Sequence, residues 1–425
     1  MLVGRRRQSG RRWGFAPTVC AAVTSLLVGA AVFLCPGVGA AAVRSSEAST
    51  VDAPGWTTGP VITDFGLVWE SSAGVMLTNS ARESSVLAAP GAPNWDNVVD
   101  QAWFGLDWWV LARPSGVVGG RIGAALREVP LLQRCNPASP TAPVPPAAEP
   151  LYAVSGEDVY AALPQRCFAR HGKQWAVVSI DLRTSRWHML GGGPGTADSL
   201  AASGGYVALA YARTYSRPTA GDPNPTTGSV FVRVWDAARG APGNQIKLNP
   251  RAVPLAGSVV QVDERGDVLI STGCCGARQL AHAAQPAEIQ EFWWARAGSA
   301  VAKEVQLGHD AVLSDGQVAF LSSDPGSPSV ETIEVTDLLT GATRTIVSFP
   351  GTATANGLAF SGDILAWEQQ SWVMNESTDC KAVALSPPQL ASVDLRGVPA
   401  SPIPVNGVPI PPQDEPTGPG CPQPV

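Results

Sequence analysis

Apolar and polar residues alternate along most of the chain in short runs that are typical of β-strands. The stretch "AFSGDILAW" (359–367) places a Ser-Gly-Asp turn between two such runs, and "VLSDGQVAF" (312–320) repeats the arrangement 47 residues earlier. Because successive side chains of a strand point to opposite faces, each stretch predicts two antiparallel strands joined by a tight turn. The recurrence indicates a repeated structural unit.

The repeat extends through most of the chain. Each copy has an apolar strand, a turn that contains glycine, and a second strand that ends in Ala, Leu or an aromatic residue. The turn glycines are Gly66, Gly105, Gly156, Gly205, Gly266, Gly316 and Gly362. They are 39 to 61 residues apart, which lies in or near the range expected for propeller blades.

The second half of each copy also recurs, as a strand, a turn led by aspartate, and another strand. Four copies have this aspartate at the same place: Asp181, Asp236, Asp337 and Asp394. An aspartate there bonds its own backbone two residues on, so we interpret all four as turn formers rather than catalytic acids. Four strands per copy, named A to D, make one antiparallel blade. The sequence predicts an all-β, seven-bladed propeller, with six or eight blades as alternatives.

This pattern resembles the TolB-type and tryptophan-aspartate-like propellers, whose repeats carry a similar Ser-x-Asp-Gly turn before an apolar strand, clearest here in "LSDGQVAF". The resemblance spans roughly residues 55–405 and concerns the fold. Such propellers serve many unrelated functions, so the resemblance implies an architecture and no active site.

Loop lengths distinguish the two faces of such a propeller. The A-to-B and C-to-D turns are short and share one face, whereas the B-to-C loops share the other. Four of these loops are long: 164–174, 213–228, 272–289 and 369–388. Loops beyond about a dozen residues are usually functional or disordered, so we predict that the long-loop face binds a partner. The candidate contact residues are Phe168, Arg213, Tyr215 and Trp372.

The N-terminus has the pattern of an export signal. Five arginines precede a segment, 13–43, that has no charged residue, and "VGA" before Ala41 offers small residues to a signal peptidase. An uncleaved signal anchor is the alternative, because Thr18 to Leu34 is nearly long enough to span a bilayer. We therefore expect a signal peptide or anchor at 1–40, a linker at 41–54, the propeller at 55–405 and a Pro-rich tail at 406–425.

Charge and cysteine content narrow the partners. Loss of residues 1–40 removes five arginines and no acid, so the formal net charge falls from −6 to about −11. Nucleic acid is then a poor partner. Six cysteines follow the export segment: Cys135, Cys167, Cys274, Cys275, Cys380 and Cys421. An even number in an exported chain favours disulfides; Cys135 with Cys167 and Cys380 with Cys421 are the pairs we consider.

Candidate chemistry is sparse. The sequence has no HExxH, GxSxG or phosphate-binding loop motif, and we expect no metal or cofactor. The favoured function is a non-enzymatic scaffold, secreted or in the cell envelope of a bacterium, monomeric, which binds a protein, peptide or glycan and contacts the membrane only if the anchor is uncleaved. The alternative is a secreted hydrolase or lyase acting on glycans or peptides. Carboxylates, or a carboxylate and a histidine, that converge with raised pKa near the central channel would favour the enzyme.

Overall fold

The computed structural model of the chain describes most of the repeat region. The described residues are 48–53, 56–89, 102–113, 116–129, 150–164, 167, 174–214, 228–248, 258–272, 291–324, 327–349, 353–375, 381–384 and 388–397. The chain divides into two units, Met1–Arg44 and Ser45–Val425, and every described residue belongs to the second. The expected signal segment at 1–40 and tail at 406–425 lie outside the described residues.

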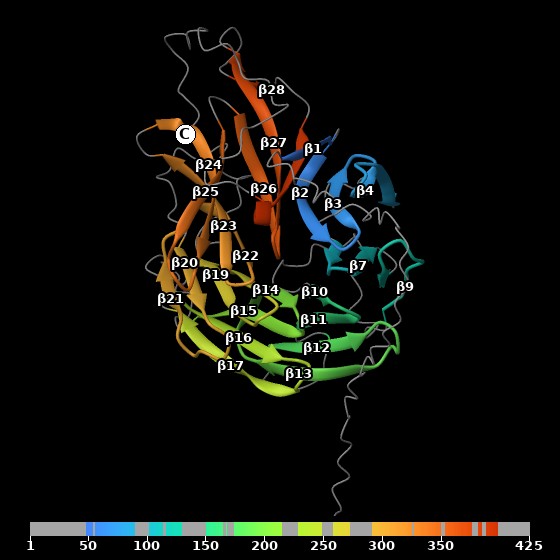
Figure 1. Ribbon diagram of the computed structural model, residues 1–425. Helices are drawn as coiled ribbons and strands as arrows, with labels where there is room; N and C mark the ends of the chain where they lie inside the picture. Colours follow the sequence, from blue (N-terminus) through green and yellow to red (C-terminus); the bar gives the residue numbers. More distant parts are fainter. Residues whose placement is uncertain are drawn as a thin grey trace, which may run out of the picture. The chain divides into compact units, whose positions relative to one another are not determined.

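The second unit is an all-β propeller with seven blades, as predicted (Figure 1). Within each of the first six blades the strands pair antiparallel in chain order. The first three blades are β2 (Trp56–Thr63), β3 (Gly66–Ser71), β4 (Gly74–Thr78) and β5 (Ser84–Ala88); β6 (Ala102–Phe104), β7 (Trp108–Arg113), β8 (Gly116–Arg121) and β9 (Arg127–Glu128); and β10 (Leu151–Ser155), β11 (Asp158–Pro164), β12 (Trp175–Asp181) and β13 (Trp187–Gly193). The alternatives of six or eight blades are therefore wrong.

The remaining blades follow the same order until the last. The next three blades are β14 (Thr196–Ser203), β15 (Tyr206–Thr214), β16 (Gly228–Asp236) and β17 (Ala241–Leu248); β18 (Ser258–Val262), β19 (Val268–Thr272), β20 (Glu291–Ala295) and β21 (Lys303–Val305); and β22 (His309–Ser314), β23 (Gln317–Asp324), β24 (Ser327–Asp337) and β25 (Thr343–Phe349). All seven turn glycines predicted from the sequence lie between or at the edges of A and B strands.

The seventh blade combines strands from both ends of the repeat region. Its A, B and C strands are β26 (Ala353–Ser361), β27 (Ile364–Asn375) and β29 (Gln389–Asp394), and its outer strand is β1 (Ser49–Asp52), which pairs antiparallel with β29. The B strand also extends past the blade and pairs there with β28 (Lys381–Ala384). Joining the first and last strands of the repeats in one sheet closes the ring of blades and covers an edge.

This closure corrects two expectations. Residues 49–52, which we expected to belong to a linker, form a blade strand. The turn led by Asp394 does not lead to a fourth strand; it continues into a short 3₁₀ helix, Leu395–Gly397, and Asp394 caps it by accepting the amide of Arg396 at 3.1 Å. The aspartate therefore forms a turn as predicted, but the outer strand comes from the other end of the sequence.

Hydrophobic packing between blades explains why apolar residues occupy both faces of the strands. The described residues form seven buried clusters, one between each pair of neighbouring blades. Along β12, Trp175 and Val177 pack towards the fourth blade, whereas Ala176 and Val178 pack towards the second. Burying both faces removes apolar surface from water on each side of every sheet.

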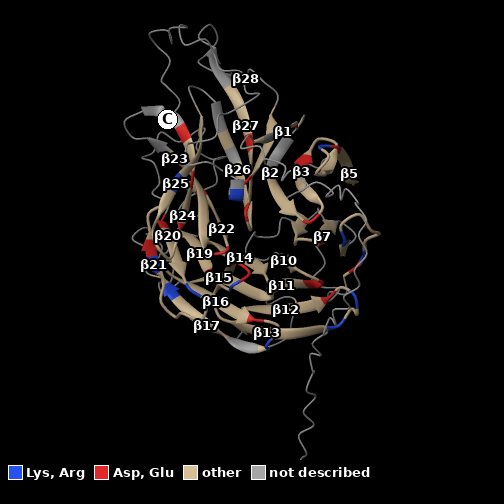
Figure 2. Ribbon diagram, viewed as in Figure 1, with Lys and Arg blue, Asp and Glu red and all other residues tan. Residues whose placement is uncertain are grey.

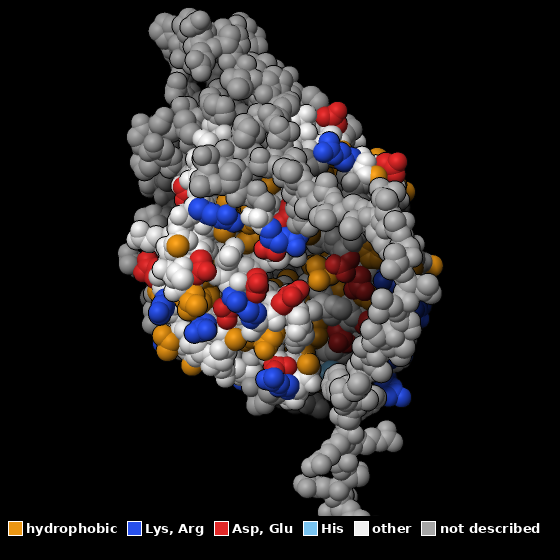
Figure 3. All heavy atoms as spheres, in the orientation of Figure 1, with side chains coloured by type: hydrophobic (Ala, Val, Ile, Leu, Met, Phe, Trp, Pro, Cys, Tyr) orange, Lys and Arg blue, Asp and Glu red, His pale blue; other side chains and the backbone are white. Residues whose placement is uncertain are grey.

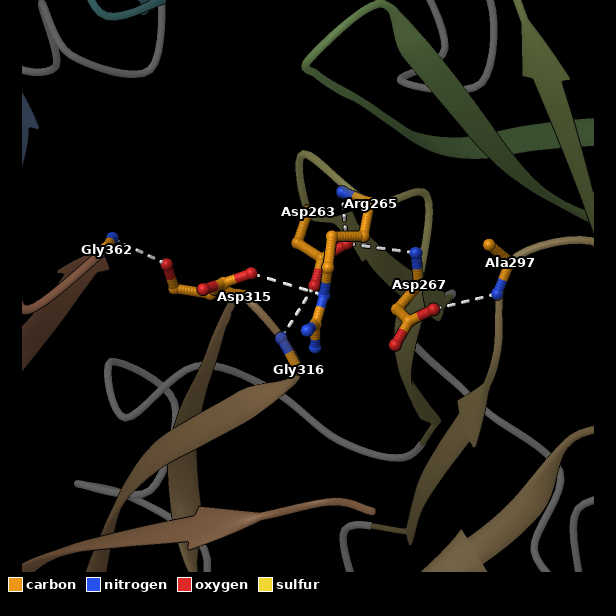
Figure 4. A network of polar contacts seen from close by, with 8 residues as sticks. Asp263, Arg265, Asp267, Ala297, Asp315, Gly316 and Gly362 are labelled. Carbon is orange, nitrogen blue, oxygen red and sulfur yellow. Dashed lines mark hydrogen bonds and ion pairs between the residues drawn. The ribbon is translucent and has the colours of Figure 1, made fainter.

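Side chains of the A-to-B turns also connect successive blades. Ser155 accepts a hydrogen bond from the amide of Gly205 at 3.4 Å, and Ser314 accepts one from the amide of Gly362 at 2.8 Å. Asp263 occupies the equivalent place in the fifth blade and accepts the amide of Gly316 at 2.8 Å (Figure 4). At these three turns the Ser or Asp that precedes the glycine thus has a structural role, because it binds an amide of the next blade.

Candidate functional site

The structure describes one of the four predicted contact residues fully. Phe168 and Tyr215 lie outside the described residues. Trp372 lies in β27, in the extension beyond the blade, where it is opposite Ala384 of β28. Arg213 lies one residue before the end of β15, where the 213–228 loop begins. Arg213 is therefore the predicted residue on which a site can be built.

Arg213 lies over two aromatic rings of its own blade. The guanidinium carbon is 4.9 Å from the ring centroid of Phe231 and 5.7 Å from that of Tyr211. The two rings stack on each other with centroids 5.4 Å apart, and Tyr211 also contacts Trp175 of the third blade. Since Tyr211 and Phe231 are buried, the rings fix the position of the cation, which they also attract electrostatically.

The Nε atom of Arg213 has no hydrogen-bond partner, and no acidic side chain of the described residues pairs with the guanidinium. Its Nε atom is buried without a hydrogen bond, and among the described residues Arg213 forms no ion pair. Leaving a buried donor unsatisfied costs about 1–3 kcal/mol, so such a group in a native structure calls for an explanation. A fixed cation that lacks an anion among the described residues is suited to binding an anionic group of a partner.

Charged side chains of the short turns behave differently, because they form ion pairs. Arg265 Nε is 3.2 Å from Asp315 Oδ1 (Figure 4), and Arg183 Nε is 3.1 Å from Glu157 Oε2. Acidic and basic side chains lie next to one another around the middle of the face that Figure 3 shows. Exposed pairs of this kind contribute little to stability, but each arginine in them has a carboxylate that balances its charge. No described carboxylate does so for Arg213.

Sequence analysis missed a histidine between two carboxylates at the start of the sixth blade. His309 Nδ1 is 3.3 Å from Asp310 Oδ2, and its Nε2 is 3.6 Å from Glu331 Oε1. Glu331 also accepts the amide of Ala355, in the inner strand of the seventh blade, at 2.7 Å. His309 begins an A strand, so the group lies at the end of the blade where the long loops are. The adjacent His-Asp pair in the sequence was the available signal.

The carboxylates and the histidine shift one another's protonation. The hydrogen bond to Asp310 raises the pKa of His309 above its ordinary value, and nearby Glu331 acts in the same direction. Burial raises the pKa of Glu331. Asp310 has a φ of +51°, a region that aspartate tolerates better than most residues. The three side chains therefore form one polar group that joins the start of the sixth blade to the inner strand of the seventh.

A second carboxylate that the sequence did not single out joins the fourth and fifth blades. Ser258 Oγ donates to Asp198 Oδ2 at 2.9 Å, and Ser199 Oγ donates to the carbonyl of Ser258 at 2.8 Å. Burial raises the pKa of Asp198 to about 6. Both Asp198 and Ser258 lie near the starts of A strands, on the same side as His309. These contacts join the fourth blade to the fifth.

A depression of about 390 Å³ opens on the third blade. Its lining residues are Asp158, Ser179, Asp181, Arg183, Thr184, Arg186 and His188. Ser179 Oγ donates to Asp158 at 3.4 Å, and burial, assisted by Asp181, raises the pKa of Asp158. Asp181 forms the C-to-D turn by accepting the amides of Arg183 and Thr184 at 2.8 and 2.9 Å. The depression is thus built mostly around a structural turn.

The cysteines lie mostly outside the described residues. Cys167 is fully buried and disulfide-bonded. Cys135, Cys274, Cys275, Cys380 and Cys421 are outside the described residues, so the proposed pairing of Cys135 with Cys167 stays a prediction. Cys167 packs in the cluster between the second and third blades, which also contains Val129 and Tyr152. In the sequence, Cys135 lies between these two residues.

No group of three or more His, Cys, Asp and Glu side chains in the described parts of the chain is arranged to hold a metal ion. Nor does any helix there have the length and apolar character needed to cross a bilayer.

Comparison with known proteins assigns no family, and several solved structures are similar at low identity. No family model and no curated protein matches the sequence. The RRP9 WD40 repeats have a TM-score of 0.43 at 10% identity, over 82% of this chain and 97% of that chain. TolB from Acinetobacter baumannii has a TM-score of 0.31 at 10% identity, over 82% and 80%.

An acylaminoacyl peptidase in complex with a chloromethyl ketone is also similar, with a TM-score of 0.38 at 10% identity, over 66% of this chain and 44% of that one. The chain thus spans less than half the length of that peptidase. The predicted fold-level resemblance to TolB-like and WD40 propellers is confirmed. At these identities the likeness concerns the fold alone.

Proposed function

We propose that this chain is an exported bacterial propeller that acts as a non-enzymatic binding scaffold in the cell envelope or outside the cell. Its partner, a protein, peptide or glycan, contacts the long-loop face. The blades supply a rigid frame, since hydrophobic clusters lie between all neighbouring blades in the described region. Rigid frames that carry variable loops are a common arrangement for binding sites.

The environment of Arg213 is the main support for this proposal. Arg213 lies at the long-loop end of β15, on two buried rings, with a buried Nε that has no partner. Arginine and aromatic residues dominate binding energy at interfaces, and a side chain already fixed in place loses little entropy on binding. The short-turn end, in contrast, uses its polar groups to connect blades.

Capture from the source organism's envelope tests this function. Full-length wild-type chain, Arg213→Ala and the matched control Arg265→Ala serve as baits, because Arg265 is a paired arginine on the short-turn face. The proposal expects a specific partner that the Arg213 variant loses and the control keeps. A partner retained equally by all three baits, or lost only with Arg265→Ala, contradicts it.

Export is part of the proposal and has its own test. The arginine-rich start and the uncharged segment that follows motivate it. The N-terminal sequence of the protein produced in a GC-rich bacterial host is expected to begin at Ala41 in the culture medium or envelope fraction. An intact N-terminus embedded in membranes supports the anchor instead, and an intact cytoplasmic chain contradicts export.

One observation favours the second candidate function, a hydrolase or lyase acting on glycans or peptides. His309 and Glu331 form a carboxylate–histidine pair with raised pKa values at an inner strand, which matches the kind of residues that we expected of an enzyme near the central channel. Both groups already have structural contacts, since Glu331 accepts the amide of Ala355. Turnover of peptide or glycan substrates that His309→Gln abolishes, without loss of folding, would establish this function over the scaffold.

A further inference from the structure

Arg213 belongs to a row of three basic residues on one face of the fourth blade. Arg233 in β16 also lies over an aromatic ring, 5.9 Å from the centroid of Trp235, and its Nε is likewise buried without a partner. Lys247 of β17 pairs in register with Phe231, and it is exposed. We call Arg213, Arg233 and Lys247 the basic row.

Alternation along the strands places all three side chains on the same face. Tyr211, Phe231 and Trp235 pack against the third blade, whereas Val230, Val232 and Ile246 pack against the fifth. Arg213 is two residues from Tyr211, and Arg233 is two residues from both Phe231 and Trp235, so both arginines point to the same side as these rings. Lys247 is opposite Phe231 and also points to that side. Successive side chains of a strand alternate between faces, so the basic row faces the third blade. Figure 2 shows where β16 and β17 lie, with basic residues in blue.

Among the described residues of β15, β16 and β17, no acidic side chain shares the face of the basic row. The other residues that share this face on β15, β16 and β17 are Val207, Leu209, Tyr211, Ser229, Phe231, Trp235 and Gln245. Within the described part of the chain no ion pair involves Arg213, Arg233 or Lys247. The chain as a whole has a formal net charge of −6. The basic row is therefore a positively charged region on a protein whose net charge is negative.

Two glycines of the third blade lie against the aromatic rings of this region, next to Leu190, which packs in the same inter-blade cluster. Gly191 and Gly193 of β13 lie against the rings of Trp235 and Trp175, where an added Cβ would approach ring atoms to 3.2 and 2.9 Å. An added Cβ would therefore crowd the ring at Gly191 and clash with it at Gly193, and no side chain from these two positions covers the row. Arg213 and Arg233 are half-buried and Lys247 is exposed, so part of each of these cationic side chains is open to solvent.

We propose that the basic row binds an acidic polysaccharide, one that carries a carboxylate on repeating sugar units. This inference rests on the proposed binding function and names its ligand class. Arg213 lies opposite Ser229, which is four residues from Arg233 along β16, or about 13 Å of extended strand. The guanidinium groups suit planar carboxylates. Ser229 and Gln245, between and beside the cations, offer hydrogen bonds to hydroxyl groups.

Binding of defined polymers to the full-length chain tests the proposal. The probes are polygalacturonate, uncharged dextran and poly-L-glutamate, each measured by calorimetry at low and high salt. Polygalacturonate is expected to bind, more weakly as salt rises, and dextran is not. Arg213→Gln with Arg233→Gln is expected to weaken binding by about tenfold or more. Lys247→Gln, which changes an exposed side chain and spares the fold, is expected to weaken it about threefold.

Lys303→Gln is the matched control, because Lys303 is an exposed lysine on the outer strand of the next blade. It is expected to bind like the wild type. Equal binding by Lys247→Gln and Lys303→Gln, or binding of dextran as tight as that of polygalacturonate, overturns the proposal. Poly-L-glutamate bound more tightly than polygalacturonate shows an acidic peptide as the ligand and also overturns it. The binding function survives these failures if envelope capture still depends on Arg213.

Discussion

The amide of Gly316 donates a hydrogen bond of 2.8 Å to Oδ2 of Asp263, and this bond joins the fifth blade to the sixth. The other oxygen of Asp263 accepts the amides of Arg265 and Asp267 at 3.0 and 2.9 Å, so one carboxylate organises two turns (Figure 4). Gly316 adopts a φ of +74°, which glycine allows without strain. The pair shows how the recurrent turn residues connect the blades.

Replacing Asp263 with alanine is expected to destabilise the propeller. Three backbone amides lose their acceptor, and leaving buried donors unpaired predicts a loss of about 2–3 kcal/mol in the free energy of unfolding. Urea denaturation measures it. Asp315→Asn, which alters an exposed partner of Arg265 with 67% of its side chain accessible, is the control and is expected to change stability by less than about 0.5 kcal/mol. Equal effects of the two changes contradict this role of Asp263.

Asp198 is expected to make stability depend on pH. Burial raises its pKa to about 6 in the folded chain, above the ordinary value near 4. The folded state therefore binds the proton more tightly, and the resulting stability is present below about pH 4 and is lost as pH rises through 6. The wild type is expected to lose about 2–3 kcal/mol from this group across that window.

Asp198→Asn removes the titrating group, so its unfolding free energy relative to the wild type is expected to rise between pH 4.5 and pH 7.5. Urea denaturation at the two pH values, with Asp64→Asn as the control, measures the difference. A constant difference between wild type and Asp198→Asn would show that Asp198 does not titrate in this range.

His309 is expected to hold its proton above the pH at which a free histidine loses it. The hydrogen bond to Asp310, followed by the charges of Asp310 and Glu331, raises its pKa. Stability from this contact is present below about pH 6.5 and is lost as pH rises through the raised pKa. NMR titration of the imidazole protons is expected to show the raised value in the wild type and a lower one in Asp310→Asn. A pKa at or below 6.5 in the wild type contradicts the contact.

The disulfide of Cys167 is expected to include Cys135. Both residues occur in segments that enter the third blade on the long-loop face, and Cys167 is disulfide-bonded and buried. Peptide mapping without reduction is expected to find the two in one cross-linked peptide, which separates after reduction. Detection of Cys135 as a free thiol, or of Cys167 linked to Cys274 or Cys275, rejects this pairing.

The sequence predicts most of the fold because the signals of each blade are local. A turn such as that at Gly362 and the strands on either side lie within about ten residues, so alternation and turn chemistry identify them. The outer strand of the seventh blade is different. Ser49–Asp52 has only four residues, and its partner β29 lies more than 330 positions away. No local pattern links the two, so closure of the ring is visible only in three dimensions.

The candidate site is less predictable than the blades, because its residues are far apart in the sequence and meet only in the folded chain. Arg213 stands out because it begins a long loop, yet the rings beneath it come from Tyr211 and Phe231, which only strand pairing brings together. His309 and Glu331 are 22 residues apart on different strands, and Asp198 meets Ser258 across 60 residues. The burial that raises their pKa values arises from packing between blades, which a sequence alone does not reveal.

The most direct test of the account is hydrogen exchange of the full-length chain with and without the partner captured from the envelope. We predict slower exchange at the long-loop ends of the blades, including the end of β15 at Arg213 and the start of β22 at His309. The short turns are expected to exchange as they do in the free chain. Protection confined to the turns around Gly316, Asp337 and Gly362 would contradict the account, because it would place the partner on the opposite face.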